Sequence, residues 1–175
     1  MSISLKGITL LCVLSASAAQ GGEMSEYKVK ALFLYNFAQF IEWPVLTFKD
    51  ASAPITICVL EPNPFEDELE RAVWKKAVDG RTLVVRQLAE PKQSTGCNIL
   101  FISSAQPRRV KPLLSELKVG GLLTVGEVEG FASQGGVINF KIKDGSVRLE
   151  INKSAAEREG LHISSKLLSL AEIVK

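Results

Sequence analysis

The side chains that most often carry out chemistry are few in this sequence. His162 is the single histidine, and it stands between Leu161 and Ile163. A nucleophilic serine or cysteine needs a neighbouring base, and a metal site needs clustered histidine, cysteine or carboxylate ligands. We therefore expect no catalytic residue, no metal and no cofactor, and we expect a structural or exposed role for His162.

The run Ser164-Ser165-Lys166 offers one catalytic alternative, because a buried lysine can activate a neighbouring serine. A serine at the start of a helix also caps it by accepting a hydrogen bond from a backbone N–H, which needs no further partner. We favour capping, and an exported serine hydrolase is the weakest of the functional hypotheses.

Glycines gather between residues 120 and 136 and could surround a phosphate or another anion. They do not form the GxGxxG pattern that follows a strand and opens a helix in dinucleotide-binding proteins, and turns explain them. The mouth of an α/β sheet near residues 126–136 is still a candidate pocket for a small ligand. Glu150 falls in a predicted core strand, so we expect a cationic partner for it, such as Arg148 or Lys166.

The first 18 residues have the features of a secretory signal peptide. Lys6 is their only charge, an apolar run occupies residues 8–14, and small residues follow at 15–19. This order predicts export and cleavage after Ala18, with Ala19 as the alternative.

A membrane anchor is the alternative to a cleaved leader, but a spanning helix needs about 20 apolar residues and this run is under half that length. Cys12 could suggest lipid attachment, although Leu11 stands where a small residue is expected. The remaining residues, 19–175, are enough for one domain with a single core. Removing Lys6 lowers the formal net charge of +2 by one, which argues against a nucleic-acid partner.

Two cysteines, Cys58 and Cys97, follow the leader. An even count in an exported protein favours one disulfide, and closing a loop of about 40 residues would stabilise the fold by roughly 4 kcal/mol on the chain-entropy estimate. Two buried free thiols are the alternative.

The elements that must position these side chains alternate between helix and strand. Helical patterns cover residues 25–43 (ended by Pro44), 64–78 and 108–118, and strand patterns cover residues 55–60, 81–87, 98–103 and 122–125. Two alternating strands, 136–143 and 146–152, then meet at Asp144-Gly145, a strong hairpin signal. Helices at 154–159, ended by Gly160, and from Ser164 or Ser165 to 174 complete the chain. The sequence predicts a single three-layer α/β/α domain with a mainly parallel sheet and a C-terminal antiparallel hairpin.

The first helix is more apolar than a surface helix needs to be. Beyond one apolar line facing the core, it carries a second line formed by Phe33, Phe37 and Phe40, and Trp43 extends this cover. Full burial is one explanation. We favour an additional interface with a partner or a second copy, because aromatic clusters concentrate binding energy.

Two stretches resemble the YfiR family of periplasmic regulators. The first is residues 27–44, YKVKALFLYNFAQFIEWP, and the second runs from GGVINF at 135–140 through VRLEIN at 147–152 to GLHISSKLL at 160–168. The resemblance spans essentially the whole chain beyond the leader. Its motif residues in the second half include Asn139, Phe140, Glu150, Ser164, Ser165 and Lys166.

The resemblance implies a periplasmic α/β protein that dimerises and has no catalytic activity. It would bind the periplasmic sensory domain of an inner-membrane diguanylate cyclase and repress it, which lowers cyclic-di-GMP and biofilm formation. An outer-membrane, peptidoglycan-associated lipoprotein would sequester the repressor. Cys58 and Cys97 would be a redox-responsive pair, although the second bridge of some relatives has no cysteines here. The alternative is a periplasmic small-ligand binding protein that serves another membrane receptor or a sensor kinase.

Overall fold

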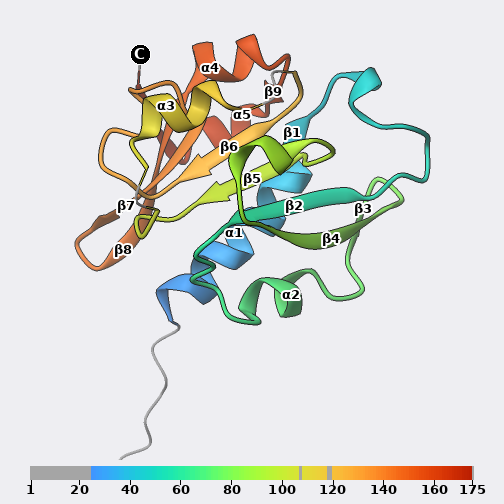
Figure 1. Ribbon diagram of the computed structural model, residues 1–175, viewed down its shortest axis with the longest axis horizontal. Coiled ribbons are helices and arrows are strands. Elements are labelled where there is room, and N and C mark those ends of the chain that lie inside the picture. The colour runs from blue at the N-terminus through green and yellow to red at the C-terminus, as the bar shows by residue number, and fades with distance from the viewer. Residues whose placement is uncertain (1–24, 107, 118–119, 175) are drawn as a thin grey trace, which may run out of the picture.

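Eight strands form the sheet at the centre of the computed structural model, in the order β10-β8-β7-β6-β5-β2-β4-β3 (Figure 1). The structure describes residues 25–106, 108–117 and 120–174, so the predicted leader lies outside the described residues. The strands of this sheet are β2 (Ile55–Leu60), β3 (Ala77–Val78), β4 (Arg81–Leu88), β5 (Ile99–Ile102), β6 (Leu123–Gly126), β7 (Ile138–Lys143), β8 (Ser146–Asn152) and β10 (Ala171–Val174).

The central strands β4, β2, β5, β6 and β7 run parallel, and β8 turns back antiparallel to β7. The turn between β7 and β8 is Asp144-Gly145, and both residues have positive φ, 52° and 69°, as the tight hairpin turn requires. The predicted fold class, a mainly parallel α/β sheet with a C-terminal antiparallel hairpin, is confirmed.

Helices cover both faces of the sheet because the buried strands are apolar on both sides. Alternate residues of β2, such as Ile57 and Val59, join α1 (Glu26–Phe40) and α2 (Glu68–Val73) in one core cluster. Cys58 and Leu60 point the other way and join α3 (Val110–Ser115) in a second cluster. The remaining helices are α4 (Lys153–Arg158), α5 (Ser165–Leu168) and the 3-10 turns η1 (Val45–Thr47) and η2 (Pro91–Ser94).

Gly126 and Gly136 make room for a buried aromatic side chain. Phe131 is fully buried, and a Cβ atom on either Gly126 or Gly136 would overlap its ring. These two glycines therefore allow the loop between β6 and β7 to fold over the aromatic ring.

Four predicted helices are shorter in the structure. The first helix ends at Phe40, where Ile41–Glu42 form the short strand β1 and pair with β9 (His162–Ile163). The helix predicted from residue 64 begins only at Glu68, after a positive φ of 53° at Glu66, and ends at Val73 before β3. The third, predicted over residues 108–118, is limited to α3.

The last predicted helix is wrong over most of its length. Ser164 caps α5, which spans only four residues, and the chain then enters β10 alongside β8 in parallel register. No helix within the described ranges is long and apolar enough to cross a membrane.

Candidate interaction surface

The aromatic line of α1 divides between the core and the surface. Phe37 is fully buried, with 0% of its surface exposed, and its ring stacks on Phe140 at 5.9 Å between centroids. Phe33 is partly exposed and lies 6.1 Å from Phe37 and 5.9 Å from Phe140. Phe37 and Phe140 are therefore core residues in the single chain, and Phe37 does not present an interface surface.

The end of α1 meets the segment that begins at Gly160. The backbone N–H of Ser164 donates to the carbonyl of Phe40 at 3.0 Å, and the ammonium of Lys166 lies 5.3 Å from the Phe40 ring centroid. Ile41 pairs with Ile163 in the two-stranded sheet. The two stretches that carry the sequence resemblance are thus brought together, with Phe40 and Trp43 partly exposed at their junction.

The two serines of this segment lie at the start of α5. Ser164 Oγ accepts a hydrogen bond from the backbone N–H of Leu167 at 3.3 Å, as predicted for a cap, and Ser165 is the first residue of α5. Lys166 is exposed and faces Phe40. His162 is also exposed, opposite Glu42 in the strand pair.

An apolar tip, formed by Val45 and Leu46, projects directly after this junction. The two side chains are 91% and 96% exposed, the highest values among the exposed large apolar side chains of the described chain. Trp43 and Phe48, on either side of the tip in the sequence, pack against each other with their ring centroids 6.3 Å apart. The tip was not predicted from the sequence, although two consecutive apolar residues directly after the helix-stopping Pro44 were a usable signal.

Glu150 and Asn139 face each other across the hairpin. The amide of Asn139 donates to Glu150 at 2.9 Å, and Lys141 pairs with the same carboxylate at 3.0 Å. The prediction that Arg148 or Lys166 pairs with Glu150 is therefore wrong. The ion pair is formed instead by Lys141, which lies on the neighbouring antiparallel strand β7. Burial opposes ionisation of Glu150, but the hydrogen bonds from Asn139 and Lys141 outweigh it and lower its pKa.

A polar cleft of about 330 Å³ lies beside these residues, at the carboxyl ends of β5 and β6. Its lining includes Tyr27, Lys30, Ser104, Glu127, Asn139 and Glu150.

A buried ion pair forms one wall of the polar cleft. Lys30 and Glu127 are 3% and 4% exposed and are in direct contact, and Glu26 also pairs with Lys30. Glu127 further accepts hydrogen bonds from the Tyr27 hydroxyl at 3.1 Å and from the Ser104 backbone N–H at 2.9 Å. Burial, and then the negative charge of Glu127, raise the pKa of Tyr27 to about 12.

The ion pair of Lys30 and Glu127 was also not predicted from the sequence. Lys30 lies in phase with Leu34 and Phe37 on the buried side of α1, and a lysine in an apolar line requires an acidic partner. That spacing could have identified Lys30, but its partner is 97 residues away.

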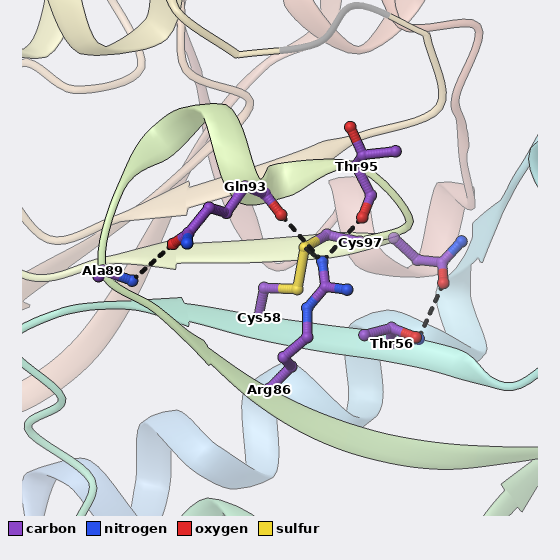
Figure 2. The surroundings of a disulfide bond; sticks show 8 residues. Thr56, Cys58, Arg86, Ala89, Gln93, Thr95 and Cys97 are labelled. Atoms are coloured by element: carbon purple, nitrogen blue, oxygen red, sulfur yellow. Dashed lines mark hydrogen bonds between the residues drawn. A yellow bond between two sulfur atoms is a disulfide. The ribbon is translucent and has the colours of Figure 1, made fainter.

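The two cysteines form a disulfide, with 5.8 Å between their Cα atoms. Cys58 lies in β2 and Cys97 precedes the adjacent strand β5, so the bridge ties two neighbouring parallel strands (Figure 2). In the described part of the chain, no group of three or more histidine, cysteine or carboxylate side chains could hold a metal ion.

Comparisons with known proteins agree with this architecture. A search of curated proteins finds no match. Among solved structures, a conserved domain protein from Vibrio cholerae O1 biovar El Tor is similar, with a TM-score of 0.56 and 14% identity. The match covers 86% of this chain and 60% of that chain, and at this identity it shows the fold alone. The model of the YfiR/HmsC-like family matches residues 27–172, and the chain belongs to this family.

Proposed function

We propose that this protein is a periplasmic regulator that binds the periplasmic sensory domain of an inner-membrane diguanylate cyclase and holds the cyclase inactive. Family membership carries the proposal, because the match extends over residues 27–172. The protein would act by binding rather than by catalysis, and repression would lower cyclic-di-GMP and biofilm formation.

The apolar tip is our candidate for the centre of the contact. Val45 and Leu46 are almost fully exposed, and apolar side chains that a partner desolvates supply much of the free energy of binding. Phe33, Phe40 and Trp43 are partly exposed, and Phe40 and Trp43 adjoin the tip in sequence. We place Phe40 and Trp43 at the edge of the same surface. Phe33 lines a separate cleft with Val29, Ile142 and Val147, and we propose it as a second contact for a partner or a second copy.

We also propose two further partners, and they rest on the sequence resemblance alone. An outer-membrane, peptidoglycan-associated lipoprotein would compete with the cyclase for the regulator, and a second copy of the chain would form a homodimer. Light scattering of the purified protein, with and without the lipoprotein, tests both associations.

The regulatory proposal is tested in cells that lack the gene. Deletion should raise cyclic-di-GMP and surface attachment, and the wild-type gene should restore both. Leu46→Asp should fail to restore them, because a charge at the tip must be desolvated on binding. Leu170→Asp is the matched control, since Leu170 is also a largely exposed leucine, at 65%, and lies in the connection from α5 to β10. Unchanged cyclic-di-GMP after deletion contradicts the proposal.

The polar cleft supports a second candidate function, binding of a small ligand. Its volume of about 330 Å³ lies in the range of small-molecule pockets, and Oδ1 of Asn139 has no hydrogen-bond partner among the described residues. Four glutamates and two lysines line the cleft, which favours a ligand with an amino group.

Thermal-shift measurements distinguish ligand classes for this cleft. Amino acids or polyamines should raise the melting temperature, whereas dicarboxylic acids should not. The absence of any shift across these compounds argues against the ligand hypothesis and leaves the regulatory one intact.

A further inference from the structure

A guanidinium group lies directly against the disulfide. Nη2 of Arg86, on β4, approaches Sγ of Cys97 at 3.0 Å and donates to the backbone carbonyls of Thr95 at 2.8 Å and Gln93 at 3.1 Å. Figure 2 shows the Arg86 side chain rising from its strand to meet the sulfur atoms and these carbonyls. The two carbonyls fix the position of the positive charge beside Cys97.

The loop that supplies these carbonyls is itself held in place. Oε1 of Gln93 accepts hydrogen bonds from the backbone N–H groups of Ala89 and Glu90, both at 3.0 Å, and the N–H of Cys97 donates to the carbonyl of Ser94 at 3.0 Å. The contact between Arg86 and Cys97 is therefore built into the connection from β4 to β5.

The two cysteines differ in their access to solvent. Cys58 is fully buried and Cys97 is 7% exposed. Cys97 also lines a cleft of about 510 Å³ that Leu46, Phe48, Thr95 and Gly96 share. A small thiol or disulfide can approach Cys97 from this cleft, and a group attached to Cys97 would lie beside the apolar tip.

We propose that Cys97 is the sulfur at which the pair exchanges with external thiols and disulfides, and that Arg86 is the positioning residue that activates it. The thiolate is the nucleophile in such exchange, and an adjacent guanidinium favours the thiolate over the thiol. This assignment concerns the two cysteines alone and does not depend on the proposed regulatory function.

Oxidation of the cysteine pair by an external disulfide takes two steps. In the reduced protein the Cys97 thiolate attacks one sulfur of an external disulfide, a Cys97–external sulfur bond forms, and one external thiolate leaves. The Cys58 thiol then attacks Sγ of Cys97, so the internal bridge forms, the second external sulfur leaves, and the proton of Cys58 passes to this departing sulfur. The pair is oxidised by two electrons and the external disulfide is reduced to two thiols. Negative charge is shared by three sulfur atoms in each transition state, and Cys97 beside Arg86 is one of them.

Alkylation of the reduced protein tests the role of Arg86. Iodoacetamide is applied across a series of pH values, and peptide mass spectrometry follows each cysteine. We expect Cys97 to react before Cys58, with a pH midpoint about one to two pH units below the ordinary thiol value of about 8.5. Arg86→Gln should raise that midpoint, Arg86→Lys should partly restore it, and the exposed control Arg148→Gln should leave it unchanged.

A second measurement uses the oxidised protein as it stands, so that loss of structure after reduction does not decide the result. A brief exposure to 2-mercaptoethanol, stopped with acid, captures the mixed disulfide. An adduct on Cys97 supports the proposal. An adduct on Cys58, or an alkylation midpoint that Arg86→Gln does not change, overturns it.

Discussion

Replacing Lys30 by methionine is the sharpest test of how α1 is anchored to the sheet. The substitution keeps the length and apolar character of the side chain but removes the charge that contacts Glu127 and Glu26. Glu26 is 47% exposed and returns to water, whereas Glu127 is 4% exposed and stays buried. The cost of the substitution is therefore set by Glu127.

Removing one member of a buried ion pair typically costs 3–5 kcal/mol, because the other charge is left without compensation. Glu127 keeps its hydrogen bonds from Tyr27 and Ser104, so we expect a loss of about 3 kcal/mol, at the lower end of that range. For a domain of this size the melting temperature should fall by about 6–12 °C.

Urea unfolding of the oxidised protein, followed by circular dichroism, measures this loss. Lys28→Met is the matched control, since Lys28 is exposed two residues away on the same helix, and it should change the stability by less than about 0.5 kcal/mol. Combining Lys30→Met with Glu127→Gln removes both charges and should restore about 1–3 kcal/mol relative to the sum of the single losses. A Lys30→Met protein as stable as the wild type, or strictly additive losses, would show that the ion pair does not stabilise the fold.

Three further predictions follow from burial, charge and the disulfide. Phe37→Ala should lower the free energy of unfolding by about 3–5 kcal/mol, and Phe40→Ala should lower it by less, because only Phe37 is fully buried; equal losses contradict this. The pKa of Glu150 is lowered in the folded state, so its ionised form stabilises the fold above the unfolded value of about 4.3, and this stabilisation is lost as the pH falls through the folded value. Acid titration of Glu150→Gln should show a weaker loss of stability below about pH 4. Cys97→Ala should lower the free energy of unfolding by about 2–4 kcal/mol and make urea unfolding insensitive to reductant. An unchanged free energy of unfolding would mean that the bridge does not stabilise the fold.

Much of the fold could be predicted because its signals are local. The apolar, β-branched run at β2 (Ile55–Leu60) reproduces the observed strand, and Asp144-Gly145 supplies the positive φ values that a two-residue hairpin turn needs. The pairing of Cys58 with Cys97 is predictable because these are the two cysteines beyond the predicted leader.

The features that were missed depend on contacts between distant residues. The segment Ala171–Val174 is a strand because β8 offers it an open edge in register, with Ile173 opposite Ile151, and the local pattern of leucines favoured a helix. The position of Glu127 beside Lys30 depends on the loop after β6 in the same way. The exposure of Leu46 could not be read from its residue type, since leucine is usually buried.

Isothermal titration of the protein with the purified periplasmic sensory domain of a diguanylate cyclase from the same organism measures whether the two bind and how tightly. We expect specific binding that Leu46→Asp weakens about ten-fold or more, as is typical of a desolvated contact residue, and that the control Leu170→Asp leaves unchanged. No binding by the wild-type protein, or equal effects of the two substitutions, would contradict this expectation.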